Sequence, residues 1–207
     1  YNGTAYSVKT TTTTGPVSTY YYTTFDAAFA IIDTVEGKTI TINGGYEFNK
    51  DCTISAGQTV EFDVATISKD AKITVEADGE LSNGFSANGI KGILVVMDDG
   101  SCIPVSGSYE VKSTDVNNNI TYSGAEVAIA NAESGSTIYI VNEVTFDDKV
   151  TIPEGVTVDV ASTAKIIVKN GLSVNGKILN KGTITMKSGN LDIAGEVDDK
   201  GSIAFDD

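Results

Sequence analysis

The chain of 207 residues contains no histidine, no arginine and no tryptophan. Without histidine, it lacks the commonest general acid–base group and the commonest transition-metal ligand. Without arginine, it lacks the bidentate fork that binds phosphate and carboxylate groups. Acidic pairs could still serve a glycosidase, but no pair stands out from the many surface carboxylates. We therefore expect no enzyme activity and no bound organic cofactor.

Basic charge is also scarce, because 14 lysines face 28 acidic residues and give a formal net charge of −14. Such a surface repels phosphate backbones and anionic lipid heads, which disfavours nucleic-acid and membrane-surface binding. No run approaches 18 consecutive apolar residues, so no transmembrane segment is expected. The sequence opens at Tyr1 without a methionine or an apolar signal segment, and we interpret it as a mature, extracellular chain.

Only two cysteines are present, Cys52 and Cys102, which are too few for a zinc site in a chain without histidine. Export would favour a disulfide between them, and the alternative is two small buried side chains. Asn2 and Asn119 open Asn-x-Ser/Thr tripeptides and are candidate N-glycosylation sites. Both features fit an exported protein.

An internal repeat is the strongest feature of the sequence. Shifted by 98 residues, 25–62 overlays 123–160 without a gap, with 13 of 38 positions identical. After a short gap, the match resumes with 71–75 against 164–168. Shared composition does not explain an ungapped register, so the chain is predicted to hold two copies of one unit.

Each copy opens with a short helix. Residues 24–32 have apolar side chains at helical spacing, with Thr24 as N-cap and Gly37 as terminator. The second helix is predicted at 124–132 and is ended by Gly135. Beyond each helix the apolar period changes from 3.6 to 2, which indicates strands.

The second copy shows a finer rhythm of apolar pairs, spaced two residues apart and recurring about every six residues, with Asn, Asp and Gly between them. The pairs are Ile138/Ile140, Val144/Phe146, Val150/Ile152, Val156/Val158, Ile166/Val168, Leu172/Val174, Ile184/Met186, Leu191/Ile193 and Ile203/Phe205.

Strands of three or four residues with tight turns are too short for a sandwich. Three such faces give a turn of about 18 residues, as in a parallel β-helix whose apolar pairs stack inside. The predicted fold class is therefore all-β: a β-solenoid, or parallel β-helix, in two tandem units that each begin with a capping helix. We expect right-handed coils, and a left-handed hexapeptide solenoid stays open as the alternative.

The predicted domains are an N-terminal arm at 1–23, a first solenoid unit at 24–121 and a second at 122–207. The arm is rich in threonine and tyrosine, which favour strands. It could pair with a neighbouring subunit, form an intramolecular edge strand or serve as a stalk. The candidate assembly residues are Tyr6, Val8, Tyr20, Tyr21 and Tyr22.

Four pairs of adjacent aspartates raise the question of calcium: 98–99, 147–148, 198–199 and 206–207. Calcium needs six to eight oxygen ligands, and neighbouring solenoid turns could stack some of them. No known calcium-loop motif is present, however, and solvated turn aspartates explain the same pattern. A calcium ion is therefore the only cofactor that stays open.

The helix followed by Gly-x-Thr-Ile-x-Ile, then 150–158 and 176–185, resembles secreted parallel β-helix repeats of bacterial and archaeal cell-surface proteins. These include adhesins, surface-layer components and sheath or filament subunits. The resemblance implies a structural protein that polymerises with copies of itself through its solenoid ends and N-terminal strand. An adhesin or carbohydrate-binding module that recognises cell-surface glycans is the alternative. Because the sequence stops in mid-solenoid without a helical cap, it fits both.

Overall fold

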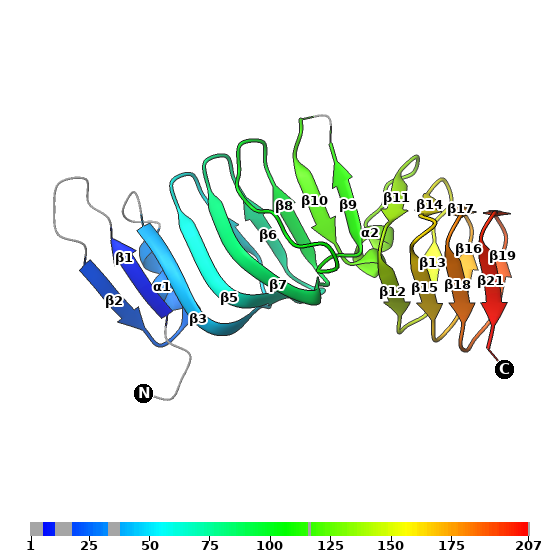
Figure 1. Ribbon diagram of the computed structural model, residues 1–207. Helices are drawn as coiled ribbons and strands as arrows, with labels where there is room; N and C mark the ends of the chain where they lie inside the picture. The colour runs from blue at the N-terminus through cyan, green and yellow to red at the C-terminus, as the bar shows by residue number, and fades with distance from the viewer. Residues whose placement is uncertain (1–5, 11–17, 33–37, 116, 207) are drawn as a thin grey trace. The chain divides into compact units, whose positions relative to one another are not determined.

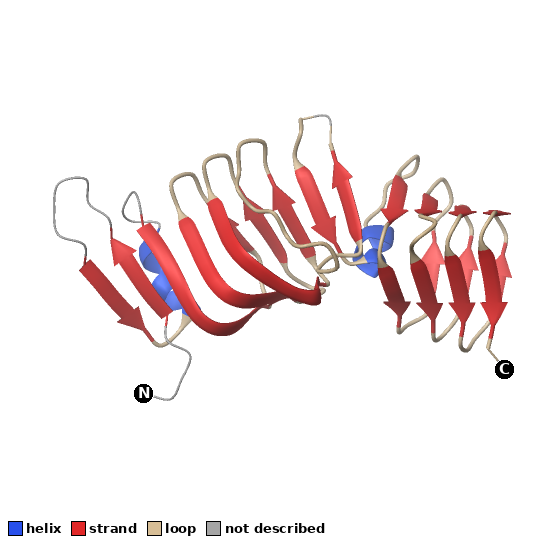
Figure 2. Ribbon diagram, in the orientation of Figure 1, coloured by secondary structure: helices blue, strands red, loops and turns tan. Residues whose placement is uncertain are grey.

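The computed structural model describes residues 6–10, 18–32, 38–115 and 117–206. The chain forms two compact units, one of residues 1–108 with 114–120 and the other of 109–113 with 121–207. In each unit, strands stack in parallel from one turn to the next (Figure 1). Among the described residues, helix is confined to two short segments (Figure 2). The predicted all-β solenoid is therefore confirmed.

Unit 1 holds three turns with paired strands, and one long strand supplies most of each turn. Equivalent positions in successive turns are paired, as Thr39 is with Thr59 and Thr59 is with Glu80. The elements are β1 (Tyr6–Thr10), β2 (Ser18–Tyr22), α1 (Phe25–Ile32), β3 (Lys38–Phe48), β4 (Cys52–Ile54), β5 (Thr59–Ile67), β6 (Lys72–Val75), β7 (Glu80–Ile90) and β8 (Ile93–Val96).

The long strands of unit 1 each cover two faces of the solenoid. The β3–β5 register shifts between Ile42 and Gly45, so the strand changes face there without ending. Gly44 sits inside this step with φ +99°, a left-handed conformation that residues with a Cβ rarely adopt. In unit 2, two separate strands cover these two faces.

Unit 2 divides each turn into three short strands, one for each face. Paired positions are 18 to 22 residues apart along the chain, close to the predicted 18. The elements are β9 (Val111–Thr114), β10 (Ile120–Ser123), α2 (Ala125–Ala130), β11 (Thr137–Ile140), β12 (Glu143–Phe146), β13 (Val150–Ile152), β14 (Thr157–Val160), β15 (Lys165–Val168), β16 (Leu172–Val174), β17 (Lys177–Asn180), β18 (Thr183–Met186), β19 (Leu191–Ile193), β20 (Glu196–Asp199) and β21 (Ser202–Phe205).

The apolar pairs predicted for unit 2 form its core. Every pair from Val144/Phe146 to Ile184/Met186 is buried, and all members except Val156, which precedes β14, stack in register through the parallel ladders. In the first turn Ile140 is buried, whereas Ile138 packs against the core from a half-buried position. The pairs of the last turn, Leu191/Ile193 and Ile203/Phe205, are not fully buried.

The 98-residue repeat is visible in the structure, and it extends further toward the N-terminus than the sequence indicated. β4 and β13 begin exactly one repeat apart, at Cys52 and Val150. β1 pairs antiparallel with β3 at Tyr6–Ile42, and β9 pairs antiparallel with β11 at Val111–Ile140. Because Ile42 and Ile140 are also 98 residues apart, the two hairpins β1–β2 and β9–β10 are equivalent. The interpretation of residues 1–23 as lying outside both copies is therefore wrong for their described part.

The resumed match after the gap, 71–75 against 164–168, does not join structurally equivalent strands. β6, which contains 72–75, pairs with β4 on the third face of unit 1. β15, which contains 165–168, pairs with β12 on the second face of unit 2. Both segments have the same alternating pattern because every inward-facing strand needs it, and a pattern alone does not specify the face.

The two helices begin in different ways. The Thr24 hydroxyl accepts a hydrogen bond from the Ala27 N–H at 3.3 Å, so the predicted cap of α1 is confirmed. Gly124, at the start of α2, has no side chain to cap it, and Glu110 of the preceding segment replaces the cap. Its Oε2 accepts the Ala125 N–H at 2.8 Å, although the glutamate side chain is buried. The predicted terminator Gly37 lies outside the described residues.

Candidate functional site

The N-terminal hairpin is an intramolecular part of unit 1. β1 lies between β2 and β3 and pairs antiparallel with both. Tyr6 and Val8 therefore belong to a strand with no free edge. Tyr20, Tyr21 and Tyr22 belong to β2, for which β1 is the only strand partner within the described part of the chain. If the hairpin contacts another subunit through a strand edge, the structure leaves β2 for it.

The last turn of unit 2 is uncovered. β19, β20 and β21 each pair with the preceding turn, and no described strand pairs with their outer edges. Ile193 and Phe205 are 53% and 61% exposed, whereas Val174 and Met186, their partners one turn earlier, are 0% and 2% exposed. Core positions thus become surface positions at this end of the unit.

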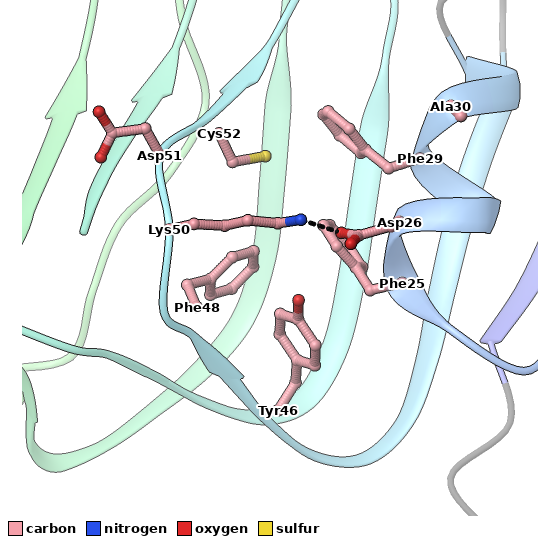
Figure 3. Close-up of a pocket in the computed structure, with 9 residues that line it drawn as sticks. All are labelled: Phe25, Asp26, Phe29, Ala30, Tyr46, Phe48, Lys50, Asp51 and Cys52. Atoms are coloured by element: carbon pink, nitrogen blue, oxygen red, sulfur yellow. Dashed lines mark ion pairs between the residues drawn. The ribbon is translucent and has the colours of Figure 1, made fainter. Parts of the chain in front are cut away.

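A pocket of about 380 Å³ opens in unit 1 between α1 and the segment that leads into β4 (Figure 3). Aromatic rings form its wall: Phe25 lies 4.7 Å from Tyr46 and 5.2 Å from Phe29 between ring centroids, and Tyr46 lies 4.8 Å from Phe48. Sequence reasoning missed the pocket, because two phenylalanines four residues apart on a helix equally indicate a buried helix face.

The mouth of this pocket is charged. Lys50 Nζ lies 2.6 Å from Asp26 Oδ1, and both side chains are more than half exposed (Figure 3). Asp51 also lines the pocket, and its Oδ1 accepts the Lys72 N–H at 2.8 Å, which ties it to the next turn. Aromatic rings beside hydrogen-bonding groups could hold one sugar ring or another small amphipathic ligand.

In three of the four aspartate pairs, one member faces a lysine. Asp147 lies 2.7 Å from Lys169, Asp198 lies 3.2 Å from Lys200, and Asp206 pairs with Lys187. The pairs 147–169 and 187–206 join successive turns. Such exposed pairs contribute about 0–1 kcal/mol each, so they add little to the stability.

Within the described ranges, no group of three or more Cys, Asp or Glu side chains is arranged to hold a metal ion. Asp99 has φ +64°, which fits a turn residue. Asp207, the last member of the aspartate pairs, lies outside the described residues. The observed lysine partners agree with the interpretation as turn aspartates.

The two cysteines are not joined by a disulfide. Cys52 stacks on Ile73, which stacks on Leu94, so two further turns lie beyond Cys52 along this face. Cys102 follows Ser101, which begins yet another turn with a bridge to Glu80. At about 4.8 Å per turn the separation is about 10 Å or more, beyond the about 7 Å between Cα atoms that a disulfide spans. The favoured intramolecular pairing is therefore not formed.

The two thiols should differ in reactivity. Burial raises the pKa of Cys102 to about 12, so this thiol stays protonated and unreactive at pH 8. Cys52 is half-buried at the pocket. A thiol titration with a chromogenic disulfide should show one reactive group in the native protein and two in denaturant. Cys52→Ser should abolish the native reaction and Cys102→Ser should leave it; the reverse pattern would contradict this assignment.

The candidate glycosylation site Asn119 is occupied by hydrogen bonds. Its Nδ2 donates to Asp115 Oδ2 at 2.8 Å, and its Oδ1 accepts the Asp98 N–H at 3.1 Å. The side-chain bond to Asn119 is the main cause that lowers the pKa of Asp115. A glycosylated asparagine keeps one Nδ2 hydrogen and its Oδ1, so these bonds do not exclude a glycan, and Asn119 stays a candidate acceptor. Asn2 lies outside the described residues.

None of the described helices is long and apolar enough to cross a membrane. Comparisons with protein-family models, with curated proteins and with solved structures each returned no match.

Proposed function

We propose that this protein is an extracellular structural subunit that assembles with copies of itself into a cell-surface polymer such as a sheath, surface layer or filament. The uncovered last turn of unit 2 is the observation that supports this proposal most. Its apolar side chains and unpaired strand edges are ready for another strand layer, and exposed edges of this kind promote association.

A surface at one end of a chain that binds a different surface of the next copy gives a heterologous contact, which grows into an open polymer unless it closes into a ring. Low catalytic potential and an acidic surface, which keeps monomers soluble before assembly, fit the same role.

Electron microscopy and sedimentation velocity of the purified chain over a range of concentrations test the proposal. We expect ordered tubes or fibrils above a critical concentration. Monomers that stay dispersed at every concentration would contradict it.

The alternative is an adhesin or carbohydrate-binding module, and the aromatic pocket beside α1 is the observation in its favour. Under this alternative, dispersed monomers would bind glycans, and Tyr46→Ala would remove that binding. Phe29→Leu, which keeps an apolar wall, is the milder comparison.

A further inference from the structure

We propose that β2 of a second copy of this chain adds to the outer edge of β21, so that copies join head to tail. This inference rests on the proposed function and names the two surfaces and the partner. It makes the N-terminal hairpin the donor of the contact and the last turn of unit 2 the acceptor.

The backbone of β21 offers unused hydrogen-bonding groups. Ser202 N–H donates to Gly182 O at 3.0 Å and Asp206 N–H donates to Met186 O at 2.9 Å, so the even-numbered residues face β18. Because successive residues of a strand point their backbone groups to opposite sides, the N–H and C=O groups of Ile203 and Phe205 point to the open edge. No described strand lies there.

Among the three strands of the last turn, β21 is the one without a charged residue, since β19 contains Asp192. β20 carries Glu196, Asp198 and Asp199 in four residues, and charges on an edge strand oppose pairing. β21 has the sequence Ser-Ile-Ala-Phe and no charge. Its Phe205 is 61% exposed and would be covered by an added strand.

β2 fits this edge in direction, charge and length. β2 is antiparallel to β1, and β1 is antiparallel to β3, so β2 runs in the same sense as the solenoid strands. It can therefore extend a parallel ladder. Its five residues, Ser-Thr-Tyr-Tyr-Tyr, carry no charge and match the four of β21. Tyr22 pairs with Tyr6, which pairs with the buried Ile42, so Tyr22 lies on the inward face, as Phe205 does, and adds an aromatic ring to the contact.

The repeat indicates why a second copy is the partner. Along the chain, the strands of the first module are followed by the hairpin β9–β10 and helix α2, which repeat β1–β2 and α1 one module later. No described strand lies beyond β21. A second copy offers a hairpin of the same kind in β1–β2.

Cross-linking tests the contact directly. Tyr22→Cys and Phe205→Cys, which lie on the same face of the proposed ladder, are made separately in a Cys52→Ser, Cys102→Ala background, mixed, and treated with a short bismaleimide. We expect heterodimers in the mixture and a ladder of multimers from the double variant. Thr185→Cys, on the interior strand β18, replaces Phe205→Cys as the matched control and should give no more than background. Cross-linking equal to that control would overturn the inference.

A second experiment blocks the edge. Phe205→Pro removes an outward N–H and leaves the bonds from β21 to β18 in place, since proline is tolerated on edge strands. We expect the critical concentration for assembly to rise at least tenfold, with unchanged circular dichroism. Thr185→Lys adds a charge to the interior strand β18, and Phe205→Lys adds the same charge to the edge strand β21. Only Phe205→Lys should block growth of the polymer. Variants that assemble like the parent would refute the β2–β21 contact but leave self-assembly standing, whereas a parent that never assembles would refute the proposed function.

Discussion

Replacement of Asn180 by aspartate is expected to lower the free energy of unfolding of unit 2 by about 3–5 kcal/mol at pH 7. Asn180 is fully buried, and its Nδ2 donates to Asp199 Oδ1 at 2.7 Å and to Ser202 O at 3.2 Å. Its Oδ1 accepts the Gly182 N–H at 3.1 Å. An aspartate would keep the last bond but would place a second carboxylate against Asp199 and an acceptor against a carbonyl.

The penalty should depend on pH. The new carboxylate is buried beside a like charge, which raises its pKa in the folded state above its unfolded value. The destabilisation is therefore full at neutral pH and falls as the pH drops through that raised pKa. Urea unfolding at pH 7 and pH 4.5 measures the difference. Asn190→Asp, in an exposed turn of the same unit, is the matched control; equal stabilities of the two variants would contradict the role given to Asn180.

The second large effect is expected for Phe146→Ala, which should destabilise unit 2 by about 3–5 kcal/mol because a large buried ring leaves a cavity. Phe146 is 1% exposed, and its repeat equivalent in unit 1 is Phe48 at 2%. Native-state hydrogen exchange should show lost protection in the strands of unit 2 for Phe146→Ala and in those of unit 1 for Phe48→Ala.

Tyr139→Ala removes a half-exposed ring from unit 2 and should change protection little. Equal loss of protection in both units from either phenylalanine variant would contradict the expectation that each phenylalanine stabilises its own unit.

The solenoid itself could be predicted from the sequence because its core has a simple rule. An inward position must be apolar in every turn, so pairs such as Val158/Val160 and Ile166/Val168 mark their strands directly. The repeat was equally readable wherever the two copies keep the same turn lengths. After Phe62 the alignment of the two copies no longer joins equivalent strands, because the turns of the two copies differ in length. There, only the pairing of strands identifies the solenoid face to which a segment belongs.

The equivalence of the hairpins β1–β2 and β9–β10 could not be predicted from the sequence. Antiparallel pairing at the start of a module fixes which residues lie opposite each other, but it places few demands on which residue types they are. Tyr6 and Val111 occupy equivalent places opposite Ile42 and Ile140, yet share little beyond strand propensity. The predicted disulfide is wrong for a related reason. Cys52 and Cys102 are separated by whole turns, and their distance along the solenoid axis follows from the sequence only if the number of residues in each turn is known.

The aromatic pocket could not be predicted from the sequence for a different reason. Its rings come from α1 and from the second-face part of β3, and the sequence showed each as an ordinary apolar pattern. Whether such patterns close into a core or leave a hollow depends on how the helix packs on the first turn, which no local pattern specifies.

The stacking of unit 2 also has a mechanical consequence. Hydrogen bonds such as Thr157 N–H to Ser136 O and Lys177 N–H to Val156 O run from turn to turn, and a force that separates the turns would load them lengthwise. We expect such a stack to open one turn at a time, and each opened turn of about 20 residues to release about 70 Å of chain. Under load the unit would lengthen in steps, because each turn would unfold as a whole and would refold as a whole when the force is released.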